Sequence, residues 1–443
     1  MPDYAETIRQ TLTQGVTTPT QLLDSIKISQ PTLSRQLRAL GDDVVRIGKG
    51  KSIQYALRDR RHGLPEIPVY RVDGAGKLLF LGQLLAIYPQ GFVMQEASGR
   101  SVRSDDLPWW LYDMRPQGYL GRAWARQHAQ RFDFPEDIRR WADHHVLRAL
   151  LADGVDMSGN LLIGEACRAR FLHMQAPEQV EDKARRYPEL AAQAATGELA
   201  GSSAGGEQPK FTAYTAEGHV IVKFSEAEAG PVSERWRDLL LAEYWALATL
   251  RASGFEAAAS AIIDSAAAQR FLESTRFDRV GATGRVGLHS LTALDLQFTG
   301  NASEGWVGVT RALAQQGVIT PAAAERAALL WAFGTLIGNS DMHGGNLSFI
   351  DDGAPPYRLA PVYDMTAMAF APTSGGGLPA ALPALTLRAD ITPAQWRQAL
   401  DLARQWLAQL QADERLSARF TPCIQALERH HADAAAQLAR LAV

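Results

Sequence analysis

The chain has 443 residues, a formal net charge of −3, and 46% hydrophobic against 21% charged residues, the composition of an ordinary globular protein of more than one domain. No run of about eighteen apolar residues is present, and the N-terminus has neither a basic nor an apolar leader, so neither a membrane span nor a secretory signal is expected. Two distant cysteines, Cys167 and Cys423, follow no metal-binding spacing, which favours a reduced, cytoplasmic chain.

The N-terminal part differs from the rest in charge. Residues 1–61 hold ten Lys/Arg against six Asp/Glu, so a small basic module is joined to a larger acidic one. The pattern predicts helices over residues 5–14, 20–25 and 30–40. Thr18 and Pro19 supply the N-cap and first-turn signals of the second helix.

A hairpin with a basic tip is expected after the third helix, with strands over residues 44–47 and 52–57. Three helices and such a hairpin predict a winged helix-turn-helix domain over residues 1–61, whose third helix enters the major groove of double-stranded DNA. The side chains expected to contact DNA are Gln30, Thr32, Ser34, Arg35 and Arg38 of the helix and Arg46, Lys49 and Lys51 of the hairpin. Similar helix patterns occur in proteins that bind no nucleic acid, so protein docking is the alternative.

A linker and a strand-rich segment follow. Residues 58–63 have linker composition, and short strands are expected over residues 69–72, 78–81 and 91–94. A helix is predicted over residues 138–151. It contains the pair His144-His145, which we interpret as a surface or capping feature, because no carboxylate or cysteine stands at metal-ligand spacing from it.

A glycine-rich stretch, residues 201–210, precedes a predicted strand pair. Glycine lets backbone amides approach a phosphate, because it has no Cβ. The second strand carries Lys223 inside the apolar run 220–224, where a lysine is unfavourable unless it is paired. Kinases use such a lysine to hold nucleotide phosphates and brace it with a glutamate on the next helix. Glu243, in an apolar stretch of the predicted helix 233–253, is the matching candidate.

Two further loops complete this pattern. Asp341 is followed by Asn346 and, after a predicted strand–turn–strand, by Asp364. One carboxylate to orient the attacking hydroxyl and a few hard oxygen ligands for Mg²⁺ are what phosphoryl transfer requires. Taken alone, each of these residues could simply cap a turn. Together with the glycine loop, the strand lysine, the helix glutamate and a hinge near Arg276, they occur in kinase order.

From about Ile67 onward the chain resembles the HipA family (YjjJ-like type), the serine/threonine kinase toxins of bacterial HipBA toxin–antitoxin systems. The segments that carry the resemblance are residues 203–210, 222–223, 276–279, 339–346 and 359–364.

The resemblance implies a role for each matching residue. Asp341 would be the catalytic base, Asn346 and Asp364 would ligate Mg²⁺, and Ser203 or the adjacent Ser202 would be autophosphorylated. The ATP-binding residues would be Gly205, Gly206, Glu207, Gln208, Pro209, Lys210, Lys223, Glu243, Thr275, Arg276, Phe277, His343, Gly344, Gly345, Asn346, Tyr363 and Asp364.

The expected fold is α+β: the winged helix-turn-helix, then a two-lobed protein-kinase-like domain. Residues 67–280 would form the HipA-like N-terminal subdomain and N-lobe, and residues 281–443 an α-rich C-lobe. Helices are expected over residues 190–200, 321–337, 393–410 and 421–441.

Several alternatives stay open. In HipBA systems the DNA-binding antitoxin is a separate chain, whereas a DNA-binding module precedes the kinase here, so an antitoxin partner could be needed or replaced. The 341–346 loop also resembles aminoglycoside and choline phosphotransferases. A transcription regulator that only senses nucleotide is a third reading. A homodimer on paired half-sites is expected if the module binds DNA in the usual way. The protein substrate is not readable from the sequence.

Overall fold

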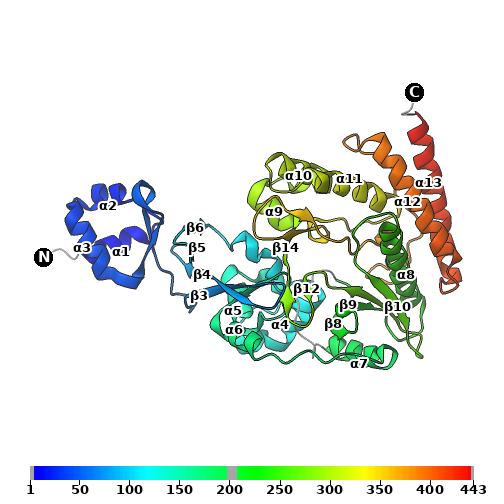
Figure 1. Ribbon diagram of the computed structural model, residues 1–443, viewed down its shortest axis with the longest axis horizontal. Coiled ribbons are helices and arrows are strands. Elements are labelled where there is room, and N and C mark those ends of the chain that lie inside the picture. The colour runs from blue at the N-terminus through cyan, green and yellow to red at the C-terminus, as the bar shows by residue number, and fades with distance from the viewer. Residues whose placement is uncertain (1–3, 197–206, 441–443) are drawn as a thin grey trace.

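The computed structural model describes residues 4–196 and 207–440. The molecule is elongated: a small N-terminal module projects from a larger body, and the C-terminal helix lies at the opposite end (Figure 1). Within the described residues, no helix has both the length and the apolarity needed to cross a membrane.

The N-terminal module is built from α1 (Tyr4–Leu12), α2 (Pro19–Ile26) and α3 (Gln30–Leu40). Thr18 caps α2 in a reciprocal capping box with Gln21, which satisfies backbone groups at the helix start. Ser29 caps α3. Buried leucines from all three helices and from the following hairpin form a core that belongs to the module itself.

A two-stranded antiparallel hairpin, β1 (Val44–Ile47) and β2 (Gln54–Leu57), closes the module. Its turn contains a short 3-10 segment, so the second strand begins two residues later than predicted. The hairpin is not a free wing: Val45, Ile47 and Ala56 pack against residues of the next domain. The module therefore shares a second, smaller core with the body.

The body begins with a five-stranded antiparallel sheet in the order β6-β5-β4-β3-β7. Its strands are β3 (Ile67–Val72), β4 (Leu78–Ala86), β5 (Phe92–Glu96), β6 (Ser101–Ser104) and β7 (Leu161–Ile163). The short 3-10 helix Trp109–Met114 and the helices α4 (Gly118–Phe132), α5 (Asp143–Asp153) and α6 (Glu165–Leu172) accompany it. We call this part, residues 64–172, the middle domain.

A four-stranded antiparallel sheet in the order β10-β11-β9-β8 forms the next layer. It contains β8 (Lys210–Thr215), β9 (Gly218–Phe224), β10 (Ser260–Asp264) and β11 (Arg270–Thr275). Helices α7 (Lys183–Thr196) and α8 (Pro231–Ala252) pack against it. This sheet positions Lys210 and Lys223 as register partners on adjacent strands.

The remaining chain is mainly helical. After the small ladder β12 (Arg279–Val280) and β13 (Gly284–Arg285), the three strands β14 (Gly287–Ser290), β15 (Ser348–Asp351) and β16 (Arg358–Leu359) form a sheet beside the cavity described below. The helices are α9 (Leu291–Phe298), α10 (Gly305–Gln315), α11 (Pro321–Leu336), α12 (Pro393–Ala412) and α13 (Thr421–Arg440). They bury the largest apolar core of the molecule.

Two predicted helices have different bounds in the structure. The predicted helix over residues 138–151 divides into a 3-10 turn, Ile138–Arg140, and α5, which begins only at Asp143. The break follows from Trp141, which turns into the core and donates its indole N–H to the Pro135 carbonyl at 2.7 Å. The helix predicted over residues 190–200 begins earlier, at Lys183, and has Pro188 inside it.

Candidate active site

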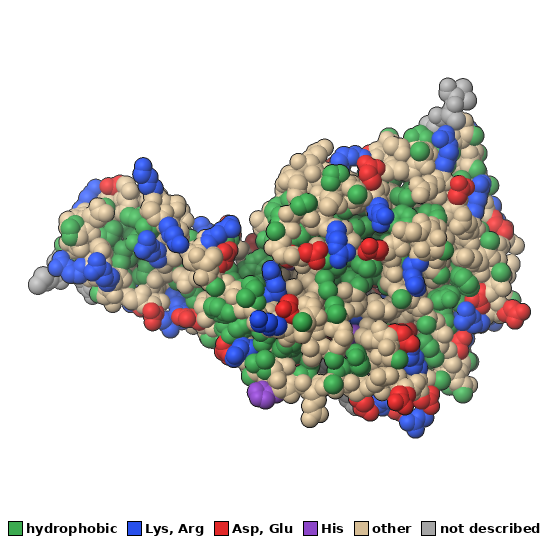
Figure 2. Space-filling view, in the orientation of Figure 1, with side chains coloured by type: hydrophobic (Ala, Val, Ile, Leu, Met, Phe, Trp, Pro, Cys, Tyr) green, Lys and Arg blue, Asp and Glu red, His purple; other side chains and the backbone are tan. Residues whose placement is uncertain are grey.

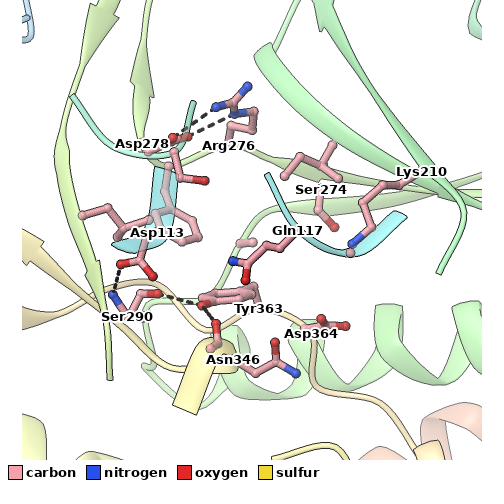
Figure 3. A pocket seen from close by; sticks show the side chains of 18 of the residues that line it. Asp113, Gln117, Lys210, Ser274, Arg276, Asp278, Ser290, Asn346, Tyr363 and Asp364 are labelled. Carbon is pink, nitrogen blue, oxygen red and sulfur yellow. Dashed lines mark hydrogen bonds and ion pairs between the residues drawn. The ribbon is translucent and has the colours of Figure 1, made fainter. Parts of the chain in front are cut away.

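A cavity of about 500 Å³ lies where the middle domain, the β8–β11 sheet and the α-rich region meet. Its lining joins segments far apart in the sequence, and Figure 3 shows their side chains converging on one space. Of the residues predicted to bind ATP, those at the cavity wall are Glu207, Lys210, Lys223, Glu243, Thr275, Arg276, Phe277, His343, Gly345, Asn346, Tyr363 and Asp364, and the predicted base Asp341 lines it too.

Lys223 joins two acidic side chains. Its ammonium donates to both carboxylate oxygens of Glu243, at 2.7 and 2.8 Å, and also contacts the carboxylate of Asp364. Lys223 comes from β9, Glu243 from α8 and Asp364 from the segment after β16, so the contact ties three elements together. Burial opposes its charge, yet the neighbouring carboxylates raise the pKa of Lys223 above its usual value. Lys223 therefore stays charged.

Lys210 is a second buried lysine at the same wall, 3% exposed. Burial, together with the nearby Lys223, lowers its pKa to about 8, although Asp364 opposes the shift. A lysine pKa this low is rare in proteins overall, and such lowered values are concentrated at functional sites. The two lysines bring two cationic groups to this wall, beside the carboxylates of Glu243 and Asp364.

The predicted catalytic loop also lines the cavity. The Asp341 backbone N–H donates to Asn339 at 3.0 Å, and the Asn346 amide donates to the Asp341 carbonyl at 2.9 Å. These bonds fix the loop, while the Asp341 carboxylate stays half-exposed with His343 Nε2 at 3.8 Å. Partial burial raises the pKa of Asp341, which His343 opposes. This carboxylate is positioned to accept a hydrogen bond from a ligand hydroxyl.

The residues predicted to hold Mg²⁺ fit that role in their chemistry. The amide nitrogen of Asn346 is used in the bond to Asp341, so the amide oxygen is its ligand-type atom. The nearby cations Lys223 and Lys210 hold the pKa of the half-buried Asp364 below its usual value, so Asp364 is a carboxylate. Within residues 4–196 and 207–440, no cluster of three or more His, Cys, Asp or Glu residues could hold a metal by itself. Mg²⁺ typically takes one or two protein oxygens and completes its shell with phosphates and water, which this pair allows.

Asp364 is held in an uncommon backbone conformation. Its φ of 55° lies in the left-handed region, which is rare for residues other than glycine, asparagine and aspartate. The preceding Tyr363 anchors the segment: its hydroxyl lies 2.7 Å from Ser348 Oγ and donates to the Gly345 carbonyl at 2.7 Å. These bonds tie the residue before Asp364 to Gly345 of the catalytic loop and to Ser348 of β15, and so fix the position of Asp364. Figure 3 shows Tyr363 beside Asp364.

The predicted hinge is fixed by a buried ionic cluster. The Arg276 guanidinium is 4% exposed and binds both Asp156, at 2.9 Å, and Asp278, at 3.1 Å. Arg279 contacts the same two carboxylates. Because Asp156 belongs to the middle domain, the cluster ties the hinge to that domain. The Arg276 charge is thus already compensated by protein.

The sequence pattern did not identify the middle domain's share of the cavity wall. Asp113 is half-buried and accepts a 2.6 Å bond from the Ser290 N–H, and its partial burial raises its pKa. Figure 3 shows Gln117 between Asp113 and Lys210. The cavity residues absent from the prediction include Tyr112, Asp113, Gln117, Gly118, Ser158, Leu288, Ser290, Thr292 and Ser348. No spacing rule links residues 112–118 to loops two hundred positions later, so only the fold reveals this.

Some predicted residues are not at the cavity wall. Gln208, Pro209 and Gly344 are absent from its lining. Glu207 does line the cavity and also forms an ion pair with Arg122 of α4. The predicted residues Ser202, Ser203, Gly205 and Gly206 lie outside the described part of the chain.

The predicted DNA-contact residues form a separate group on the N-terminal module. Thr32 is half-buried, and the others are exposed: Gln30, Ser34, Arg35, Arg38, Arg46, Lys49 and Lys51. Figure 2 shows Lys and Arg side chains over this module. None of these residues lines the cavity.

Two family models match the chain. The model described as "YjjJ-like toxin, middle domain" matches residues 64–172, and that described as "HipA-like C-terminal domain" matches residues 202–435. The chain is 40% identical to "Toxin YjjJ" of Escherichia coli (strain K12) over 416 residues, which cover 92% of this chain and 93% of the relative.

Solved structures resemble the fold at low sequence identity. HipA of Shewanella oneidensis MR-1, solved with HipB and operator DNA, aligns at a TM-score of 0.53 and 14% identity over 84% of this chain and 97% of that chain. The proinflammatory kinase CtkA of Helicobacter pylori aligns at a TM-score of 0.38 and 14% identity over 53% of this chain and 95% of that chain.

Proposed function

Since the chain belongs to the family of YjjJ-like toxins with a HipA-like C-terminal domain, we propose that it is an ATP- and Mg²⁺-dependent serine/threonine protein kinase. One observation carries the proposal: Lys223 contacts Glu243 and Asp364 at the wall of the cavity that Asp341 and Asn346 also line. That arrangement supplies, in one space, cations for phosphates, oxygen ligands for Mg²⁺ and a carboxylate for the attacking hydroxyl.

Each side chain then has a separate task. Lys223, braced by Glu243, binds nucleotide phosphate, and the nearby Lys210 adds positive charge to the same wall. Asn346 and Asp364 provide oxygens for Mg²⁺, which when bound would neutralise charge on the phosphates. Asp341 accepts a hydrogen bond from the substrate hydroxyl and orients its oxygen toward the transferred phosphoryl group.

The adenine would lie against the hinge side of the cavity. Thr275, Phe277 and Tyr363 line that region, and the rings of Phe277 and Tyr363 are 5.6 Å apart. The Asp156–Arg276–Asp278 cluster keeps the hinge in place, so we assign Arg276 a positioning task.

The test is incubation of the purified chain with γ-labelled ATP and Mg²⁺, with and without a general protein substrate. We expect label on protein serine or threonine for the wild type and for Asp352→Ala, an exposed acid on the neighbouring hairpin, and none for Asp341→Ala. Label that appears only on an aminoglycoside- or choline-type acceptor would make the chain a small-molecule phosphotransferase. ATP binding without any transfer would make it a nucleotide sensor.

We further propose that the chain phosphorylates itself at Ser203 or Ser202. A phosphate there would add roughly −1.5 to −2 charges beside a glycine-rich stretch expected to bind ATP phosphates, and would switch the enzyme off. Mass spectrometry of wild type, Ser202→Ala and Ser203→Ala after incubation with ATP tests this. Phosphate on neither serine in the wild type rejects it.

The N-terminal module, residues 1–61, is proposed to be a winged helix-turn-helix that binds double-stranded DNA, near the chain's own promoter as an autoregulator. Support comes from the capped helix α3, which presents Gln30, Ser34 and Arg35 at the surface of the module. Arg35→Ala should change sequence preference more than Lys49→Ala, because helix residues read bases and hairpin residues contact phosphate. Equal loss on all sequences in both variants would contradict this reading.

The division of the body is a proposal as well: residues 67–280 as N-terminal subdomain and N-lobe, and residues 281–443 as C-lobe. Whether a separate antitoxin binds, and whether the chain dimerises on DNA, can be tested by co-purification and by light scattering of the DNA complex.

A further inference from the structure

The hairpin of the N-terminal module and the middle domain meet in a packed seam. Val45 and Ile47 of β1 and Ala56 of β2 pack on Leu85, Ile87 and Val93 of the middle-domain sheet. Backbone bonds reinforce the contact, since the Tyr88 N–H donates to the Leu57 carbonyl and the Asp59 N–H to the Ala86 carbonyl. The module is therefore held in a fixed orientation against the middle domain.

Strand register places a basic side chain at the rim of this seam. Val93 pairs with Leu85 on one side and with Arg103 of β6 on the other. Directly paired residues in an antiparallel sheet point to the same face. Arg103 therefore lies on the face that receives the hairpin, and β6 is the edge strand beside β1. Along β1, Arg46 alternates with Val45 and Ile47 and points away from the sheet.

The tip of the hairpin approaches the same place. The Lys49 ammonium lies beside Gly99, in the turn before β6. A Cβ added to Gly99 would be 3.1 Å from the Lys49 nitrogen. The next residue, Arg100, is exposed, as are Lys49 and Lys51. Within the described residues Arg103 pairs with Asp105, while Arg46, Lys49, Lys51 and Arg100 form no ion pair. Figure 2 shows Lys and Arg side chains continuing from the module onto the junction with the body.

We propose that Arg100 and Arg103 of the middle domain extend the DNA-binding surface beyond the N-terminal module and contact the phosphate backbone. The inference rests on the proposed DNA binding of the module. The partner is the phosphate backbone of a duplex, because five cations at a rigid seam match a periodic row of negative charges and offer no apolar pocket for a peptide. The middle domain would then take part both in the nucleotide cavity, through Asp113, and in DNA binding.

The test uses the full chain and a fluorescent duplex of mixed sequence, with anisotropy titrations over a range of salt concentrations. Each phosphate contact removed should lower the magnitude of the salt slope by about 1. Arg100→Ala combined with Arg103→Ala should therefore lower it by about 2 and weaken binding severalfold. Asp105→Asn should tighten binding, because it releases Arg103 from its carboxylate.

The matched control is Arg397→Ala combined with Arg404→Ala, which removes two exposed arginines from α12 at the far end of the molecule. It should leave both slope and affinity unchanged, and unfolding curves verify that all variants fold. A slope equal to wild type in the Arg100/Arg103 variant, with a reduced slope in Lys49→Ala, would overturn the proposal and confine the surface to the module. Absence of binding by the wild type would instead remove the proposed DNA function itself.

Discussion

Lys223 is the residue on which most of the candidate site depends, because its ammonium contacts the carboxylates of both Glu243 and Asp364. Glu243 is 2% exposed and Lys223 8% exposed, so the pair lies in a region where an uncompensated charge is costly. The same ammonium holds Asp364 next to the position proposed for Mg²⁺. The contacts of Lys223 with Glu243 and Asp364 therefore serve both the stability of the fold and the proposed chemistry.

Replacing this lysine should destabilise the chain in a way that a cation can repair. Lys223→Met leaves the buried Glu243 beside the half-buried Asp364 without a cation between them and should cost roughly 3–5 kcal/mol of unfolding free energy. Added Mg²⁺ without nucleotide should restore more stability to this variant than to wild type, because the metal replaces the lost positive charge beside Asp364. Thermal denaturation with and without Mg²⁺ measures both effects.

The control is Lys77→Met, which removes an exposed lysine of the middle domain and should leave the unfolding temperature unchanged. If Lys223→Met unfolds like wild type and does not respond to Mg²⁺, the proposed link between this lysine and the metal position is wrong.

Lys210 should give the proposed nucleotide binding a pH dependence. Its pKa of about 8 means that it is charged at pH 7 and loses its proton as the pH rises through 8. If the ammonium helps to bind phosphate, the KM for ATP should rise between pH 7 and pH 9. Lys210→Arg should abolish this rise, since a guanidinium stays charged throughout that range. Steady-state kinetics across the range test this, and an identical pH profile in both proteins would contradict it.

At the scale of elements, the bounds of a helix were predicted most accurately where several local signals agree. The third helix has the predicted bounds, Gln30–Leu40, because a serine cap, a first-turn proline and a final glycine coincide. Helix α5 was predicted to begin too early, since the core contact of Trp141 interrupts it. Helix α4 was not predicted, because its mixed Arg, Gln and Gly sequence has no strong period and it is stabilised by tertiary contacts.

The site shows the same division. The loops around Lys223 and Asp341 were predictable because phosphoryl transfer restricts both residue type and order along the chain. The contribution of Asp113 and Gln117 was not, because only folding brings the middle domain against β14. The hinge Arg276 was predicted as an ATP contact on resemblance alone, whereas its partners Asp156 and Asp278 point to a positioning task.

The hinge cluster provides an element-scale prediction. Asp278→Asn removes one of the two carboxylates that Arg276 and Arg279 share, and should lower the unfolding free energy by about 3 kcal/mol. Because the cluster positions the hinge, we expect the KM for ATP to rise more than kcat falls. Urea denaturation and steady-state kinetics measure these changes.

A matched control exists in the same chain. Asp137 and Arg139 form a similar forked pair two residues apart, but at the surface. Asp137→Asn should leave both stability and KM unchanged, because water screens an exposed pair. Equal effects of the two substitutions would show that burial of the hinge cluster has no special importance.

At the scale of the whole molecule, the seam decides how independent the N-terminal module is. The module has its own leucine core, but the inner face of its hairpin is buried only by the middle domain. Residues 1–61 alone would expose that apolar face. DNA binding is therefore better measured on the full chain than on this fragment.

Loosening the seam should expose the linker. Ile47→Ser removes an apolar contact with the middle domain and should cost about 3 kcal/mol of local packing energy. We expect faster proteolytic cleavage between residues 58 and 66, detected by mass spectrometry. Arg46→Ser, on the same strand but facing outward, should be cleaved at the wild-type rate. Identical cleavage of the two variants would mean that the seam does not restrain the module.

The central claim is that different residues of one cavity bind Mg²⁺·ATP and promote transfer of its phosphoryl group. A paired measurement on two variants tests this claim most directly. Calorimetric titration with Mg²⁺·ATP and labelled-phosphate transfer are measured on the same preparations. Asp341→Ala should bind Mg²⁺·ATP like wild type and transfer no phosphate, whereas Asp364→Ala should lose both affinity and transfer. Transfer at the wild-type rate by either variant would contradict the account.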